Sequence, residues 1–237
     1  MRGPRHRSAL VARLVSTGPG SSQEVILGEL RRVILDGGAP PGSPVPLDDV
    51  AALFGVSRIP VRESLKTLVG EGLVDHQPRA GYTVAQLTRD ELVELYVVRE
   101  VLEAAALSAA VPQAQPGDDA EAAAAHRALE QAVLHGDAHA HQRGSRRFHL
   151  ALLRPARTHR LLHMLEQAWN LTEPQQTMTH ATAVQRVQLH ADHQQMLDAF
   201  TARDLAALLA ASERHHRHLA SQVQALPEHI GLFAEPS

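Results

Sequence analysis

Three of the 16 histidines in this 237-residue chain lie on the apolar faces of three separate predicted helices. They are His149, His193 and His215, and each has leucine or other large apolar residues around it at helical spacing. Neutral imidazoles that converge from facing helices suit Zn²⁺ or Ni²⁺. A single inward histidine is more often a hydrogen-bonded core residue, so the spacing by itself leaves both a metal site and a plain core open.

A second pair of chemically active residues lies on the helix predicted over residues 88–111. Arg99 falls on the leucine stripe of this helix, and Glu103 follows it four residues later. Two charges on an inward face must be paired with each other or serve a ligand. The pattern therefore fits an ion pair that only fixes packing as well as it fits a binding site.

Three cations stand four residues apart near the start of another predicted helix, namely Arg58, Arg62 and Lys66. Ser57 is placed to cap this helix, and Pro60 falls in its first turn. The face predicted to be buried comprises Val61, Leu65, Leu68 and Val69. A helix with one packed face and one cationic face, entered through a glycine turn, is typical of a helix that reads the DNA major groove. A charged face that is only solvated is the alternative.

The segments around this cationic helix have the order of a winged helix-turn-helix. Helices are predicted over residues 24–36 and 47–54, and strand-like runs over residues 72–76 and 82–85. The first helix should bury Val25, Ile26, Leu30, Val33 and Ile34. Gly55 makes the turn between the second helix and the cationic helix. The two strands flank a Pro/Gly turn that carries Arg79 and ends at Gly81, which predicts a hairpin wing.

The composition favours a helical protein without disulfides. Aromatic residues make up only 3% of the chain, so the core must rest on leucine, valine and alanine. The absence of cysteine excludes a disulfide framework and any thiolate metal site. The net charge is −3, although residues 1–20 hold four arginines and no acid. No run of about 18 apolar residues occurs, so we expect a cytoplasmic protein that does not enter a membrane.

From Thr88 onward, only helical periodicity remains. A capping box at Thr88 and Glu91 marks the first helix and a domain boundary near Leu87. Breaks are predicted at residues 112–117, 136–137, 154–155, 172–174 and 202–204. They leave about six helices, which is an all-α bundle with ordinary loops. The predicted domains are a flexible basic arm (1–22), a winged helix-turn-helix (23–87), an all-α bundle (88–226) and an irregular tail (227–237).

The run from Val25 to Leu87 resembles the DNA-binding domain of the GntR family of bacterial transcription regulators. The matching pieces are Ile34–Gly37, Pro41–Gly42, Leu53–Arg58, Pro60–Leu65 and Glu71–Val74. Asp48 departs from the family pattern, because relatives often place a phosphate-contacting residue there. The expected DNA contacts are Arg58 and Arg62 on bases and phosphates, Ser57 and Lys66 on phosphates, and Arg79 and Gly81 in the wing.

The remainder, residues 88–225, looks like the FCD ligand-sensing domain of the FadR branch of that family. The matching pieces are Arg99–Glu103, Arg146–His149, Leu161–Leu162, His193–Ala199, Asp204 and His215–Leu219. The resemblance implies a divalent metal, Zn or Ni, held by an aspartate and three histidines under a small carboxylate effector. His149, His193 and His215 match the three histidines.

The position that matches the aspartate ligand is Ser145 in this sequence. Serine is a poor zinc ligand and brings no negative charge, so the metal affinity should fall, or water or the effector carboxylate must fill the place. A second interpretation has no metal, with the histidines and Arg99 binding an anionic effector directly. The expected effector-binding set is Arg99, Glu103 and Ser145.

These residues and the resemblance together predict a ligand-responsive transcription regulator, a repressor released by its effector. The resemblance implies that the helical domain (88–226) binds the effector and dimerises, so that a homodimer binds a palindromic operator. The run His190–His193 raises a metal-dependent hydrolase as an alternative. However, the sequence has no His-Glu-x-x-His helix, phosphate loop or nucleophile elbow, and we expect no enzyme. An architectural DNA-binding protein without a ligand would leave the inward charges and histidines unexplained.

Overall fold

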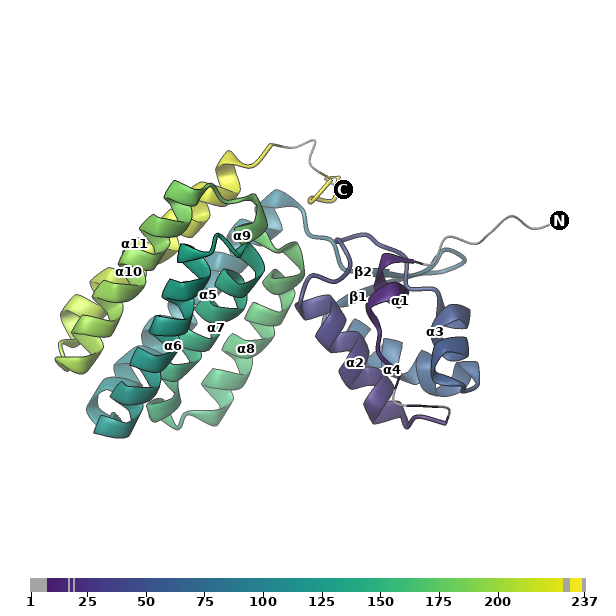
Figure 1. Cartoon of the computed structure of the whole chain (residues 1–237), viewed down its shortest axis with the longest axis horizontal. Helices are drawn as coiled ribbons and strands as arrows, with labels where there is room; N and C mark the ends of the chain where they lie inside the picture. Colours follow the sequence, from purple (N-terminus) through teal and green to yellow (C-terminus); the bar gives the residue numbers. More distant parts are fainter. Residues whose placement is uncertain (1–7, 17, 19, 228–230, 236–237) are drawn as a thin grey trace. The chain divides into compact units, whose positions relative to one another are not determined.

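The computed structural model describes residues 8–16, 18, 20–227 and 231–235, and its helices and strands are shown in Figure 1. The chain divides into two compact units between Thr88 and Arg89. The first unit contains the described residues up to Thr88, the short stretch Asn170–Gln175 and the described residues after Pro227. The second unit contains Arg89–Trp169 and Gln176–Pro227. The mainly α fold class predicted from the sequence is confirmed.

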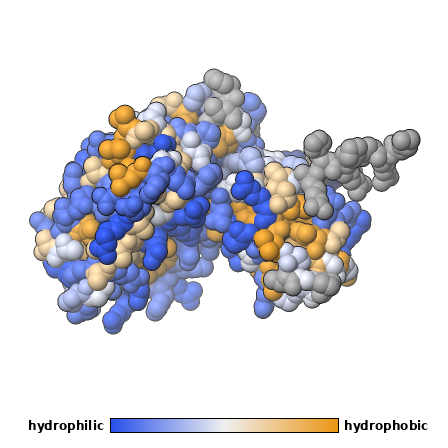
Figure 2. Space-filling view, viewed as in Figure 1, coloured by the Kyte–Doolittle hydropathy of each residue, from blue (hydrophilic) through white to orange (hydrophobic). Residues whose placement is uncertain are grey.

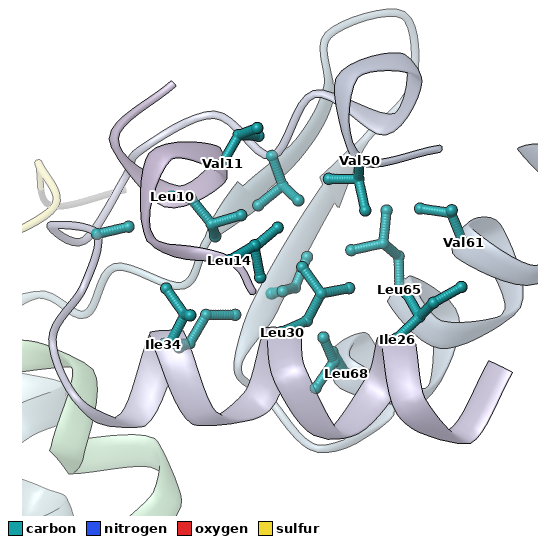
Figure 3. Close-up of a cluster of buried hydrophobic side chains, with 14 of the residues drawn as sticks. Leu10, Val11, Leu14, Ile26, Leu30, Ile34, Val50, Val61, Leu65 and Leu68 are labelled. Carbon is teal, nitrogen blue, oxygen red and sulfur yellow. The ribbon is translucent and has the colours of Figure 1, made fainter. Parts of the chain in front are cut away.

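The first unit is a winged helix-turn-helix. Its elements are α1 (Ala9–Arg13), α2 (Gln23–Leu35), α3 (Leu47–Phe54), α4 (Arg58–Gly70), β1 (Val74–Gln77) and β2 (Gly81–Val84). Leucine, isoleucine and valine side chains from all four helices meet in one apolar core (Figure 3). Val25 and Val69 were predicted to be buried, but each is 38% exposed. Ser64 takes an inward place instead, and its hydroxyl donates to the Gln23 carbonyl at 3.1 Å.

The start of the described chain belongs to this core, which corrects the prediction of a flexible arm over residues 1–22. Leu10, Val11 and Leu14 are at most 7% exposed and pack against the α2 side chains (Figure 3). The backbone N–H of Val15 also donates to Glu29 of α2 at 2.7 Å. Residues 1–7 lie outside the described part of the chain.

The turn between α3 and α4 positions the cationic helix. Gly55 adopts a left-handed conformation with φ 63°, which glycine reaches without the strain of a Cβ, and thereby ends α3. Ser57 stands at the N-cap position of α4, but its side chain makes no capping hydrogen bond. The predicted N-cap position of Ser57 is therefore confirmed, but the hydrogen bond expected from its side chain is absent.

The wing is an antiparallel hairpin in which Val74 pairs with Val84 and Gln77 with Gly81. Residues 43–45 run along the free edge of β2, because the Val45 N–H donates to the Tyr82 carbonyl at 2.8 Å. The tail that was predicted to be irregular contains no helix or strand in residues 231–235. It is nevertheless hydrogen-bonded, since Ala234 donates to the Leu87 carbonyl at 2.9 Å.

The second unit is an all-α bundle. Its α-helices are α5 (Arg89–Ala110), α6 (Pro116–Leu134), α7 (Ala138–Leu153), α8 (His159–Thr172), α9 (Thr177–His180), α10 (Ala183–Thr201) and α11 (Leu205–Ala225). Short 3₁₀ turns follow α5 and α7, at Val111–Gln113 and Arg154–Ala156. The last residues of α8, from Asn170, and the 3₁₀ turn Glu173–Gln175 are assigned to the first unit. Helices α5, α6, α7, α8 and α10 end within two residues of the breaks that the sequence predicted. The short α9 and the break after it were not predicted, so the described residues contain seven bundle α-helices and not about six.

Helix caps explain where several bundle helices begin. The side chains of Asp137 and Asp204 each accept from a backbone N–H three residues on, at 2.9 Å, and so start α7 and α11. Thr182 and Gln185 form a reciprocal capping box at the start of α10. The α6–α7 and α10–α11 pairs pack side by side, and α5 packs on α11 (Figure 1).

The core of the bundle combines an apolar layer with a polar cluster. Phe148, Trp169, Met196 and Phe200 are at most 1% exposed and form part of the apolar layer. On the face shown in Figure 2, the bundle surface is mostly hydrophilic, with small separate groups of hydrophobic residues. Within the described residues, no helix is both long and apolar enough to cross a membrane.

Candidate functional site

Three histidines meet in the core of the bundle, one from each of α7, α10 and α11. His149, His193 and His215 are at most 1% exposed, and each offers a ring nitrogen within 4.8 Å of the others. The structure thus brings together the three residues singled out from their spacing. We refer to them as the histidine trio.

Helical spacing explains why the trio converges. His149 stands one turn before Leu152 and Leu153 on α7, so the side that buries these leucines also turns the imidazole inward. The His149 ring packs edge-on against the Trp169 ring, and the His193 ring against the Phe148 ring. These edge-to-face contacts restrict the orientations of the His149 and His193 rings.

The ring nitrogens of the trio are only partly satisfied. His149 Nε2 lies 3.1 Å from His193 Nε2, and Ser145 Oγ lies 3.3 Å from the same His193 atom. Among the described residues, His193 Nδ1 and both ring nitrogens of His215 have no hydrogen-bond partner. Buried nitrogens without partners are costly, so such atoms call for a ligand.

The electrostatics keep two of these rings in the form that binds a metal. Burial lowers the pKa of His193 and of His215 well below the usual value, and the neighbouring histidines lower it further. A neutral imidazole has a lone pair to donate. The donor set therefore fits Zn²⁺ or Ni²⁺, which accept nitrogen ligands. Three protein nitrogens leave further coordination positions open.

Glu103 lies fully buried behind the trio. Its Oε1 is 2.6 Å from His149 Nδ1, and its Oε2 is 3.4 Å from His216 Nε2. Burial acts to raise the pKa of the Glu103 carboxyl, but the charges and hydrogen bonds of His149 and His216 hold it well below its usual range. Glu103 is therefore an anion that orients His149, whereas the sequence suggested that it would contact the effector.

Arg99 supplies a buried positive charge close to the trio. It is 8% exposed, and its guanidinium carbon lies 5.0 Å from the centre of the Tyr96 ring and 5.2 Å from that of Trp169. The positive charge of Arg99 also contributes to the lowered pKa of His215. A guanidinium held between aromatic faces beside neutral imidazoles is suited to bind a carboxylate.

On α4 of the first unit, the three predicted DNA-contacting cations differ in their environments. The Arg58 guanidinium is bound by the Asp48 carboxylate, with Nη2 donating to Oδ2 at 2.7 Å. Lys66 donates to Glu63 at 2.8 Å. Arg62 is exposed and makes no hydrogen bond or ion pair with any described residue. The three cations of the predicted row thus differ in one respect, because Arg58 and Lys66 are each paired with an acid.

The tip of the wing presents Arg79 to solvent, and Gly81 at the start of β2 is partly exposed. Arg79 has φ 72° and Gly81 has φ 97°, so both adopt left-handed conformations at the hairpin turn. At the base of the turn, the His76 and Tyr82 rings pack 4.5 Å apart across the two strands. This cross-strand pair holds the turn that carries the wing arginine.

Comparison with protein families accounts for both units. The model for bacterial regulatory proteins of the gntR family matches residues 22–84, and the FCD domain model matches residues 94–218, which is more than half of the chain. The chain belongs to the GntR family of bacterial transcription regulators. It carries an FCD domain and is a DNA-binding transcription regulator of that type.

Individual relatives agree with this assignment. The regulator is 30% identical to McbR from Escherichia coli over 157 residues, which cover 64% of the chain and 71% of McbR. It is 29% identical to the transcriptional repressor GlaR from Escherichia coli over 209 residues, or 82% of the chain and 90% of GlaR. The match to the YdhC regulator from Bacillus subtilis, 31% identical over 103 residues, spans 44% of the chain and 45% of YdhC.

Solved structures share the fold of the regulator. The structure of Escherichia coli McbR/YncC has a TM-score of 0.77 at 24% identity and covers 86% of this chain and 97% of that chain. A GntR regulator from Rhodococcus sp. RHA1 has a TM-score of 0.76 at 24% identity, covering 86% and 99% of the two chains. Both likenesses confirm the fold.

A buried acid near the trio, Asp192, was considered in the sequence only as part of the run His190–His193. Asp192 is fully buried, and its Oδ2 lies 2.6 Å from His218 Nδ1 and 3.9 Å from His215 Nδ1. The signal was present, because Asp192 lies on the inward stripe of α10 between Leu189 and Met196. Its partners lie on α11, so only the tertiary structure identifies them.

Proposed function

We propose that the regulator is a cytoplasmic repressor and not an enzyme, and that it dimerises through its helical unit to bind a palindromic operator. A small carboxylate effector, bound in the helical unit, would release the operator. The observation that carries this proposal is the burial of the histidine trio and Arg99 together in a domain attached to a winged helix-turn-helix. The ring nitrogens of His193 and His215 that lack a hydrogen-bond partner among the described residues are costly in a core unless a ligand satisfies them. The name of the relative GlaR supports repression over activation.

In the proposed complex with DNA, α4 enters the major groove. Arg62, which has no partner among the described residues, contacts a base or a phosphate, and Arg58 contacts a base. Ser57 and Lys66 contact phosphates, and the wing places Arg79 and Gly81 at the minor groove or the backbone. A dimer presents two copies of α4, which is why a palindromic operator is expected.

In the helical unit, His149, His193 and His215 would hold a divalent metal. When bound, Zn²⁺ or Ni²⁺ supplies a Lewis-acidic point that attracts a carboxylate. Ser145 stands beside His193 without a charge, so the anionic effector itself would complete the site. Arg99 would pair with the effector, and Glu103 would keep the Nδ1–H of His149 turned away from the metal.

Effector binding and operator binding must be coupled reciprocally. If the effector weakens operator affinity by a given factor, the operator weakens effector affinity by the same factor. The second candidate is a metal-free sensor, favoured by the absence of a carboxylate at Ser145. In that case the trio and Arg99 would bind the anionic effector directly.

The experiment begins by selecting duplexes from a random-sequence library with the full chain, purified without a tag. Release of the selected duplex by a panel of mono-, di- and tricarboxylates is then followed by fluorescence anisotropy, with Zn²⁺ or with a chelator. We expect a palindromic motif, and at least one carboxylate that releases it only with Zn²⁺. Release that is equal with the chelator would favour the metal-free candidate. A chain that enriches no sequence would overturn the proposal.

A further inference from the structure

Asp48 and Arg58 form an ion pair across the turn between α3 and α4. Asp48 Oδ1 contacts Arg58 Nε, and Arg58 Nη2 donates to Asp48 Oδ2 at 2.7 Å. The two side chains remain 56% and 66% exposed, respectively. Exposed pairs of this kind contribute little to stability, so the free energy of folding offers no reason for the arrangement.

The pair engages only one edge of the Arg58 guanidinium. A guanidinium carries five N–H groups in a fixed plane, and Asp48 takes the edge made by Nε and Nη2. The edge made by Nη1 and Nη2 keeps two parallel N–H groups. This second edge is the fork that binds O6 and N7 of guanine together. A carboxylate on the first edge restricts rotation of the side chain, so the second edge is held in place before DNA arrives.

The charge of Asp48 has a separate effect on DNA affinity. Residues 21–87 contain six Lys and Arg against eight Asp and Glu, so the winged unit is not a general polycation. Affinity for non-operator DNA depends on the number of phosphates that cations neutralise. The negative charge of Asp48 weakens the attraction of Arg58 to phosphates. The two parallel N–H groups on the Nη1/Nη2 edge of Arg58, which would bind a base, stay free of Asp48. It therefore reduces binding that carries no sequence information.

We propose that Asp48 determines specificity, by holding Arg58 for recognition of a guanine and by lowering the affinity for non-operator DNA. The inference rests on the proposed role of α4 in reading the operator. It assigns a function to the acid at the position where the sequence departs from the family pattern. Asp48 itself contacts no base and is a positioning residue.

The test compares the full-length wild type with Asp48→Asn, Arg58→Lys and the matched control Asp49→Asn. Asp49 is the neighbouring acid on α3, and its replacement makes the same charge change away from the Arg58 fork. Each protein selects duplexes from the random-sequence library. Dissociation constants are then measured for the wild-type motif, for the motif with each guanine replaced, and for an unrelated duplex.

Asp48→Asn and Arg58→Lys should lose discrimination at the same guanine of each half-site, by about tenfold or more. Asp48→Asn should also bind the unrelated duplex several-fold more tightly, while Asp49→Asn keeps the guanine preference. If Asp48→Asn binds the wild-type motif and the unrelated duplex more tightly by the same factor and keeps its guanine preference, Asp48 only offsets positive charge and the inference is wrong.

Loss of guanine discrimination in Arg58→Lys but not in Asp48→Asn would also overturn the inference. The proposed function would survive either outcome, because the wild type would still select an operator and Arg62→Ala would still weaken it. Failure of the wild type to select any motif would overturn both.

Discussion

The two units of the regulator place their charged functional residues in opposite environments. In the winged unit the core is apolar, and the cations of α4 lie on the surface of the unit. Arg58 and Lys66 are each paired with one acid there. In the helical unit the histidine trio, Arg99 and Glu103 lie inside the core, and His149 contacts both Glu103 and His193 across helices. Water screens the surface charges, so each of them contributes nearly independently of the others. Buried charges are coupled, so each group affects the charge state of its neighbours.

The largest expected effect on the surface side comes from Arg62, which has no partner among the described residues. Arg62→Ala should weaken operator binding by about 1–3 kcal/mol, because a base or phosphate contact is lost without any acid being released. Arg147→Ala, an exposed arginine of α7, is the control. Anisotropy titrations of the selected operator measure the change, and equal affinities for the two variants would refute the assignment of Arg62.

On the buried side, Glu103→Gln tests whether the network acts as a unit. The amide still accepts a hydrogen bond from His149 but carries no charge, so Zn²⁺ affinity should fall about 10–100-fold. Competition with a chromophoric chelator measures this affinity. Glu94→Gln, an exposed acid of the same helix, should leave it unchanged. If Glu103→Gln matches that control, the buried carboxylate does not tune the trio.

Buried histidines should also make the helical unit sensitive to acid. Burial, with the charges of His190 and Arg186, lowers the pKa of His141 from 6.5 to about 4. The unfolded chain therefore takes up a proton at higher pH than the folded chain, and stability is lost as the pH falls through the interval from 6.5 toward 4. Between pH 7.5 and pH 5, His141 alone should account for roughly 2 kcal/mol of the loss.

Urea unfolding in the presence of a chelator measures this loss, with the fluorescence of the buried Trp169 as the signal. His141→Gln cannot be protonated, so its stability should depend less steeply on pH over the same interval. Equal slopes for the two proteins would show that His141 is not held neutral by burial.

The smallest expected effect belongs to Lys66, an exposed cation that is already paired. Its ammonium group donates to Glu63, and the two side chains are 60% and 44% exposed. Lys66→Ala should cost less than about 1 kcal/mol, equally for operator and unrelated DNA, because it loses one phosphate contact. Titrations at several salt concentrations measure the affinities for operator and unrelated DNA, and their salt dependence reports the lost phosphate contact. A loss confined to the operator would place Lys66 on a base instead.

Most of the fold follows from local signals in the sequence. Gly55 and Pro60 mark the helix-turn-helix, and the breaks around Gly136 and Pro155 mark bundle helices, because such residues act on the backbone within a few positions. Local signals failed where tertiary packing decides the outcome. Leu10 lies in a segment that reads as a free arm, and its burial depends on the apolar face of α2.

The site could be predicted only in part. Helical spacing turned His149, His193 and His215 inward, and the resemblance to the FCD domain grouped them. The sequence could not predict which residues the acids pair with, because each pair joins two different helices. Glu103 of α5 pairs with His149 of α7, and Asp48 of α3 pairs with Arg58 of α4. Periodicity gives the direction of a side chain from its own helix, but not which atoms of the next helix it contacts.

If the buried trio holds a divalent metal, the purified protein should contain one, so we would measure the metal content per chain. Elemental mass spectrometry is carried out on the wild type and on His193→Ala, both purified without a tag or chelator and then dialysed against limiting Zn²⁺. We expect about one Zn or Ni per wild-type chain and almost none in the variant. No metal in the wild type, even after Zn²⁺ is added, would contradict it.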